Sequence, residues 1–206
     1  MKLQIKGKTM NRIIMMMLAF VFCAFLGGCA ATVQPASSAG IPSRQDVFAE
    51  HAPGQPPPPG YAELRIMSSI KTHKPGWYFG KDSHGTKEYE LLLNIGGQIA
   101  VLAGDLREEN RESGGPHDPE SGEGIRYHFM RSLHVKAGAH RIVVALPVDN
   151  IAIEREMALS EGSTNILLLE PVYRPKPVHR RITEGKTTSF RQGVKMFRLV
   201  LNGTPL

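Results

Sequence analysis

Residues 61–206 alternate between apolar and polar side chains with a period close to two. The clearest stretch is 88–103, where the alternation continues on both sides of Gly96-Gly97. Such alternation is typical of a strand with one buried face. A Gly-Gly pair favours a tight hairpin turn, because glycine tolerates positive φ angles. We therefore expect two paired strands here.

Similar patterns predict more strands along the rest of this region. They lie at 63–70, 125–135, 140–146, 151–159, 164–173 and 194–201, and turn residues separate nearly all of them. We find no stretch of helical length with a convincing apolar stripe of helical period. Seven to nine short strands with regular turns predict a mainly β fold, a single antiparallel β-sandwich spanning 61–206.

The segment 104–124 interrupts the alternation. It holds seven acidic residues and two arginines, a net charge of −5. Such a polar segment favours a long mobile loop. Its carboxylates could hold a calcium ion, because hard cations take oxygen ligands. The D-x-D-x-D-G pattern of a calcium loop is absent, which favours a solvated acidic loop instead.

The C-terminal segment 171–206 has the opposite charge, with eight basic residues and one acidic residue. Such asymmetry can mark an interaction tail, and Arg180 and Arg181 are its candidate binding residues. The alternative is that the basic segment packs beside the acidic loop. The sequence leaves both interpretations open.

The N-terminal residues 1–28 have the pattern of a targeting segment. Four basic residues precede an apolar run of fourteen, at 13–26. A spanning helix needs about 20 apolar residues, whereas this length suits a signal peptide. The following Leu26-Gly27-Gly28-Cys29 resembles a bacterial lipobox, which implies cleavage before Cys29 and lipid attachment to it. An uncleaved single-pass anchor is the alternative.

The residues after the cysteine bear on location. Ala30 and Ala31 stand where an aspartate would retain an enteric-type lipoprotein in the inner membrane. The resemblance therefore implies an outer-membrane lipoprotein that faces the periplasm or is exposed at the cell surface. In a single-membrane cell it implies a protein on the outer face of that membrane. Residues 29–60 are rich in proline, including four in a row at 56–59, which predicts a flexible tether between lipid and domain.

Composition excludes several classes of function. Cys23 lies in the predicted signal peptide and Cys29 would carry the lipid, so the domain has no thiol for a disulfide, a nucleophile or a metal site. Removing the four basic residues of the signal peptide lowers the net charge from +6 to +2. So small a charge gives no support for nucleic-acid binding.

Residues 133–147 and 157–173 show a second resemblance. Each pairs an apolar strand with a glycine-containing turn and a further apolar strand, and Gly138-Ala139-His140 fills the first turn. This arrangement resembles PEGA-like envelope domains over about 87–173, although the Pro-Glu-Gly-Ala string is absent. The resemblance implies a surface-anchored β-sandwich for binding or assembly, with no common catalytic site. We expect His140 to form a structural hydrogen bond.

The sequence contains only partial matches to catalytic motifs. Ser68 and Lys71 match S-x-x-K, but that chemistry needs them one helical turn apart. In the expected strand they would point to opposite faces. Gly185-Lys186-Thr187 lacks the preceding glycine of a phosphate-binding loop. The eight histidines show no ligand spacing along the sequence, so we expect no metal, no cofactor and no enzymatic activity.

Three adjacent aromatics, Trp77, Tyr78 and Phe79, lie between Gly76 and Gly80. They could form an edge strand that buries Trp77 and Phe79, or an exposed loop whose rings stack on a ligand. The sequence as a whole predicts a membrane-anchored lipoprotein that presents a non-catalytic sandwich to an envelope protein partner. The alternative is a glycan or small-ligand-binding module that uses the aromatic loop.

Overall fold

A computed structural model describes residues 44–51, 54–76, 82–115, 117–176 and 187–206. All of them belong to the unit Pro42–Leu206. The predicted signal peptide and residues 29–43 of the predicted tether lie outside the described residues. Within the described ranges, no helix is long and apolar enough to cross a membrane.

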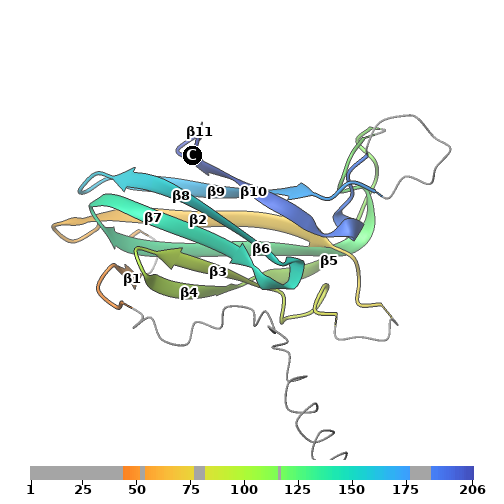
Figure 1. The fold of residues 1–206 in the computed structure, drawn as a ribbon, viewed down its shortest axis with the longest axis horizontal. Coiled ribbons are helices and arrows are strands. Elements are labelled where there is room, and N and C mark those ends of the chain that lie inside the picture. The colour runs from red at the N-terminus through yellow and green to blue at the C-terminus, as the bar shows by residue number, and fades with distance from the viewer. Residues whose placement is uncertain (1–43, 52–53, 77–81, 116, 177–186) are drawn as a thin grey trace, which may run out of the picture. The chain divides into compact units, whose positions relative to one another are not determined.

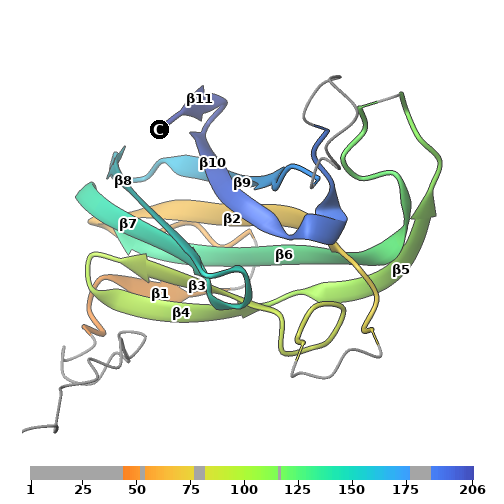
Figure 2. The same ribbon diagram turned by 45° about the vertical axis from the view of Figure 1, so that its right-hand side comes forward.

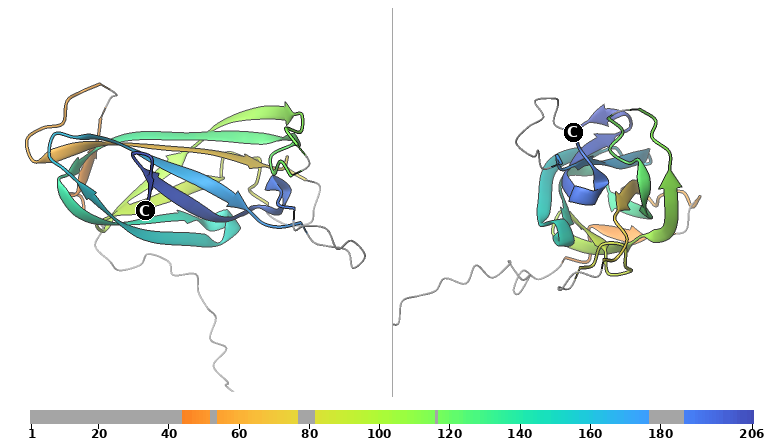
Figure 3. Two further views of the ribbon diagram at one scale, coloured as in Figure 1. Left: turned by 90° about the horizontal axis from the view of Figure 1, so that it is seen from above. Right: turned by 90° about the vertical axis from the view of Figure 1, so that its right-hand side faces the viewer.

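Two sheets pack against each other, which confirms the predicted β-sandwich (Figures 1 and 3). The larger sheet has the order β1 (Phe48–Glu50), β6 (Gly122–Lys136), β2 (Tyr61–Thr72), β9 (Thr164–Tyr173), β10 (Val194–Leu201) and β11 (Thr204–Pro205), and β5 (Asp105–Arg111) also pairs with β6. The smaller sheet has the order β4 (Gln98–Ala103), β3 (Glu90–Ile95), β7 (Gly138–Leu146) and β8 (Ile151–Leu159).

The alternating apolar positions fill the space between the sheets. Leu91, Leu93 and Ile95 of β3 are fully buried, and Tyr127 and Phe129 of β6 face the same core. Their burial on one face of each strand stabilises the sandwich, because apolar burial contributes about 25 cal/mol per Å². The period-two pattern therefore identified the buried face of these two strands correctly. In β4 the expected apolar face is wrong, because Ile99 and Val101 are exposed whereas Ala100 and Leu102 are buried.

The predicted hairpin is present as β3 and β4. Ile95 pairs with Gln98 at its end, and the turn residues Gly96 and Gly97 have φ angles of 57° and 96°. Two consecutive positive φ angles are the reason that this turn needs glycine.

The structure differs from the predicted antiparallel sandwich of seven to nine strands in two details. The described residues contain eleven strands, some of them very short. Moreover, β2 and β9 pair in parallel, from Glu63 opposite Thr164 to Ser68 opposite Leu169. This pairing joins residues about 100 positions apart, and local periodicity carries no information about such a partner.

The acidic segment 104–124 is not the single long loop that we expected. Residues 105–111 form β5, which pairs with β6 from Asp105 opposite His128 to Arg111 opposite Gly122. The strand tolerates its acids because nearby cations meet them: Arg126 of β6 binds Glu109 at 2.6 Å, and Lys74, which follows β2, binds Glu108 at 2.9 Å. Only the turn between β5 and β6 remains irregular (Figure 2).

Two short 3-10 helices complete the described fold. The first, η1 (Pro147–Asp149), connects β7 to β8, and the second, η2 (Phe190–Gln192), precedes β10. Phe190 is buried, and its backbone N–H donates to the carbonyl of Pro119. This contact fixes η2 against the β5–β6 turn at one end of the sandwich.

Candidate functional site

The residues selected from the sequence fall outside the described part of the chain. They are Cys29, Trp77, Tyr78, Phe79, Arg180 and Arg181. The ligand and interaction-tail hypotheses that rest on them therefore stay predictions. The described residues instead present two other features, a polar end and an apolar row on the outer face of the larger sheet.

The polar end has a cleft at its surface. Its volume is about 440 Å³, and its lining comes from the end of β2, the start of β6 and η2: His73, Lys74, Glu123, Arg191 and Gln192. Lys74 binds Glu123 at 2.7 Å and Glu108 at 2.9 Å. The cleft therefore offers both charges and an imidazole to a polar ligand.

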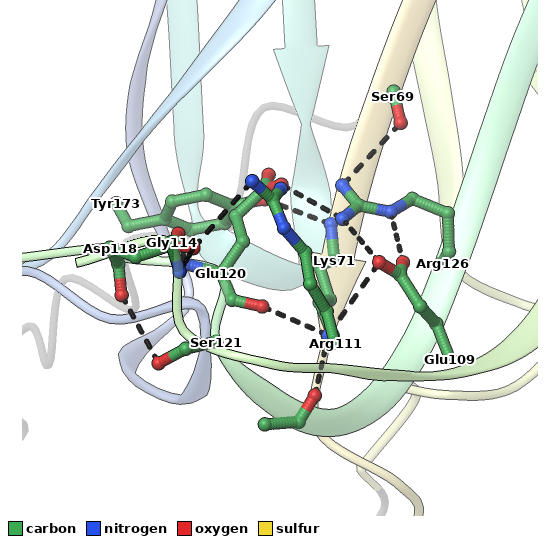
Figure 4. A network of polar contacts seen from close by, with 11 residues as sticks. Ser69, Lys71, Glu109, Arg111, Gly114, Asp118, Glu120, Ser121, Arg126 and Tyr173 are labelled. Carbon is green, nitrogen blue, oxygen red and sulfur yellow. Dashed lines mark hydrogen bonds and ion pairs between the residues drawn. The ribbon is translucent and has the colours of Figure 1, made fainter.

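Below the cleft lies a buried charged network (Figure 4). Lys71 has no exposed surface, and its Nζ donates to the carbonyls of Glu120 at 2.9 Å and Gly122 at 2.6 Å. Its ammonium also lies 5.0 Å from the centroid of the Phe190 ring. Burial lowers the pKa of Lys71, and nearby Glu109 opposes that effect.

Arg126 is the second cation of this network. Its Nε donates to Glu109 at 2.6 Å and its Nη2 to Glu120 at 2.8 Å. Burial alone would lower the pKa of Arg126, but the hydrogen bonds to the two carboxylates raise it overall. Tyr173 completes the network by donating to Glu120 at 2.7 Å (Figure 4). Every charge here has a partner, which indicates a structural role.

The acidic segment therefore finds its ion-pair partners mainly in β2 and β6, with Arg111 of β5 as a further partner. The basic C-terminal segment, the partner that the sequence left open, also lies beside the acidic segment. Tyr173 donates to Glu120 and the Phe190 backbone donates to Pro119, and the pKa of Glu123 is lowered by Lys74 and, to a smaller extent, by Arg191. The cations of β2 and β6 lie closer because β5 pairs directly with β6.

The described residues also place two histidines together, which sequence spacing did not suggest. His84 Nδ1 lies 2.7 Å from Asp82 Oδ1, and His73 Nε2 lies 3.6 Å from Asp82 Oδ2. His84 Nε2 faces Asp149 of η1 at 3.3 Å, and the Tyr89 hydroxyl donates to the same carboxylate at 2.8 Å. The only signal in the sequence was the close spacing of Asp82 and His84.

The pKa values in this cluster are shifted by their neighbours. Burial lowers the pKa of His84, but its hydrogen bonds to Asp149 and Asp82 raise it overall. Burial raises the pKa of Asp82, and hydrogen bonds from the His84 backbone and ring outweigh it, so the net shift is downward. Perturbed groups beside a cleft are typical of functional sites.

The S-x-x-K residues do not form a nucleophilic pair. Ser68 donates its hydroxyl hydrogen to the Leu169 carbonyl at 2.8 Å, whereas Lys71 binds the two carbonyls described above on the opposite face of β2. His140 has the hydrogen bond that we expected, between its Nε2 and the Lys136 carbonyl at 2.6 Å.

The second feature is an apolar row across the outer face of the larger sheet. Met67 lies opposite Met130 of β6 and opposite Leu168 of β9, and Leu168 lies opposite Val200 of β10. Met130 is 71% exposed, Met67 42% and Leu168 36%. Ile166, also on β9, is exposed as well. Three adjacent strands thus place exposed apolar side chains side by side, and the half-buried Val200 of β10 extends the row.

Comparison with known proteins returned no relatives. No family model matches the chain, no curated protein matches it, and no solved structure matches it.

Proposed function

We propose that this protein is a lipid-anchored envelope protein whose sandwich binds a protein partner without catalysing a reaction. The lipobox-like residues 26–29 and the proline-rich tether support the anchor. The glycine-containing turn before β7, with Gly138 at a φ of 124°, is consistent with a PEGA-like domain. Ala30 and Ala31 favour the outer membrane and the periplasmic side.

The observation that carries the binding role is the apolar row of Met67, Met130, Leu168 and Val200 on the larger sheet. Contiguous exposed apolar surface usually marks an interaction site. Methionine suits such a surface, because its flexible side chain adapts to a partner. The flat row fits a partner with an apolar protein surface, rather than a sugar, which would need hydrogen-bonding groups.

Site-specific photo-crosslinking in intact cells tests this proposal. A photoreactive phenylalanine derivative replaces Met130, the most exposed residue of the row. The matched control places the same derivative at Glu156, an exposed position on β8 of the other sheet. We expect a discrete heavier protein band from position 130 and none from position 156. Mass spectrometry of the purified protein reports whether Cys29 is acylated.

Equal crosslinking at both positions, or none at position 130, would contradict the protein-binding role. An unmodified Cys29 in the membrane fraction would contradict the lipid anchor. The two parts of the proposal can therefore fail separately.

Small-ligand binding is a second candidate, favoured by the cleft at His73 and Lys74. These residues shortly precede Trp77, the only tryptophan of the chain. If glycans bind near this segment, soluble envelope sugars would quench or shift the tryptophan emission in a saturable manner. An emission spectrum unchanged by a panel of such sugars would rule against this candidate.

A further inference from the structure

His73, Asp82 and His84 meet at one point beside the cleft. One potential ligand atom from each lies within 4.8 Å of the others. A tetrahedral zinc ion with bonds of about 2.0–2.2 Å would place its ligand atoms about 3.3 Å apart. Asp82 Oδ1 lies 2.7 Å from His84 Nδ1 and Asp82 Oδ2 lies 3.6 Å from His73 Nε2, so the two rings face the two oxygens of one carboxylate at distances near that value.

The hydrogen bonds of His73 leave one ring nitrogen available. Its Nδ1 lies 2.9 Å from the Lys74 carbonyl. A carbonyl oxygen only accepts, so Nδ1 carries the proton in this contact. In a neutral ring Nε2 then has a lone pair, and it faces the Asp82 carboxylate. Two electron-rich atoms facing each other are stabilised by a cation between them.

His84 shows the same pattern from the other side. Its Nε2 faces the carboxylate of Asp149 and its Nδ1 faces that of Asp82. A proton on Nε2 satisfies Asp149, and the remaining contact of Nδ1 with Asp82 then needs either a second proton or a metal ion. Both rings thus direct a nitrogen toward the same carboxylate.

The backbone holds these groups at close range through two glycines. A side chain on Gly85, whose φ is 75°, would come within 2.6 Å of Pro75 and 2.8 Å of the His73 carbonyl. Gly193, with a φ of 78°, would overlap the Asp149 carboxylate if it carried a Cβ atom. The turn after Asp82 therefore packs directly on the backbone of His73, and Asp149 packs directly on the chain that enters β10.

We propose that His73 Nε2, His84 Nδ1 and the Asp82 carboxylate bind a divalent transition-metal ion of the zinc class. Imidazole and carboxylate ligands together suit zinc and its neighbours better than calcium or magnesium, which prefer oxygen alone. Metal-bound histidines usually donate their second N–H to a carbonyl or carboxylate. The Lys74 carbonyl and Asp149 stand in those two places.

The surroundings of Asp149 strengthen its role as an orienting group. Tyr89 donates to its side chain at 2.8 Å, and Arg174 donates to its backbone carbonyl at 2.5 Å. Asp149 is buried, so its carboxylate is held in one position. It therefore orients His84 for the metal.

Three protein ligands leave at least one coordination position for water or a further ligand. His73 also lines the cleft, together with Lys74, Glu123 and Arg191. The metal site is thus continuous with a surface that a polar ligand can reach. This inference is independent of whether the apolar row binds a protein.

Zinc titration of the full-length protein in detergent tests the site. The protein is first stripped with EDTA, and ZnCl₂ binding is then followed by calorimetry. We expect a single equivalent of zinc per chain and a higher melting temperature in its presence. His73→Gln and His84→Gln should lower the affinity by at least about 100-fold, and Asp149→Asn by about 10- to 100-fold.

The matched control is His128→Gln, which removes an exposed histidine on β6 distant in register from the cluster. It should bind zinc like the unmodified protein. Metal-free melting curves and circular dichroism establish that each variant is folded, and a substitution that unfolds the domain is replaced by Asp82→Asn. The proposal is overturned by absence of stoichiometric zinc binding, by binding that survives loss of both cluster histidines, or by an equal loss in His128→Gln.

Discussion

The outer face of β2 and β6 contains two cross-strand pairs that invert the usual rule of burial. Met67 and Met130 lie opposite each other and are 42% and 71% exposed, whereas Lys71 and Arg126 lie opposite each other and are 0% and 8% exposed. Both pairs occupy outward positions of the same two strands. On this face, burial therefore depends on whether another segment of the chain covers a side chain, not on whether that side chain is polar.

At the charged pair, Glu109 of β5 and Glu120 of the β5–β6 turn supply partners for the charges, and the ring of Phe190 in η2 lies against Lys71. At the methionine pair, no strand, turn or helix of the described chain covers the side chains. Both charges of the buried pair thus have partners within the domain, whereas the exposed pair is available to a second molecule.

Arg126→Ala should cause the largest loss of stability. It leaves the Glu109 carboxylate without its arginine and Glu120 with Arg111 alone, in a mostly buried site. Breaking a buried ion pair in this way costs about 3–5 kcal/mol, and the partial exposure of Glu109 favours the lower value. Urea denaturation measures the free energy of unfolding. A loss below about 1 kcal/mol would contradict a stabilising role for the ion pairs of Arg126.

Glu109→Gln should alter the acid sensitivity of the domain. The hydrogen bond from Arg126 and nearby charges lower the pKa of Glu109 below its ordinary value of 4.5. The ionised group therefore stabilises the fold fully above that value, and the contribution disappears as the pH falls through the lowered pKa.

We expect Glu109→Gln to lose about 1.5 kcal/mol at neutral pH and much less at a pH below the lowered value. Urea denaturation at a series of pH values measures this difference. Glu156→Gln, at an exposed position on the other sheet, is the control. If the variant and the unmodified protein differ in stability by the same amount at every pH, ionised Glu109 does not stabilise the fold as predicted.

Met67→Ser should have the smallest effect on stability, within about 0.5 kcal/mol, because an exposed side chain with no covering segment contributes little to folding. The same change should weaken partner crosslinking from position 130, since it removes the neighbouring apolar side chain. A large loss of stability would show that the row is part of the domain's own packing.

Local features of the fold could be predicted from the sequence, and features that depend on distant partners could not. The β3–β4 hairpin follows from alternation around Gly96-Gly97, all within sixteen residues. The parallel pairing of β2 with β9 and the covering of Lys71 by a distant turn leave no periodic signal. For the same reason Lys71, at an outward strand position, gave no sign of being buried.

The candidate sites show the same limit. His73 and His84 approach each other only because Gly85 permits close packing of the turn on Pro75, and Asp149 arrives from η1. A search for histidines at fixed spacing misses such a group. The apolar row likewise depends on the register across four strands, and no single strand shows the row by itself.

Methionine oxidation in intact cells, compared with oxidation of the purified protein, tests whether a partner covers the apolar row in the cell. Limited peroxide treatment followed by peptide mass spectrometry reports Met67, Met130 and the buried Met157, which is 3% exposed and serves as an internal reference. We predict rapid oxidation of Met130 and Met67 in the purified protein, clear protection of both in cells, and slow oxidation of Met157 in each sample. Equal oxidation of Met67 and Met130 in cells and in isolation would contradict a bound partner on this face.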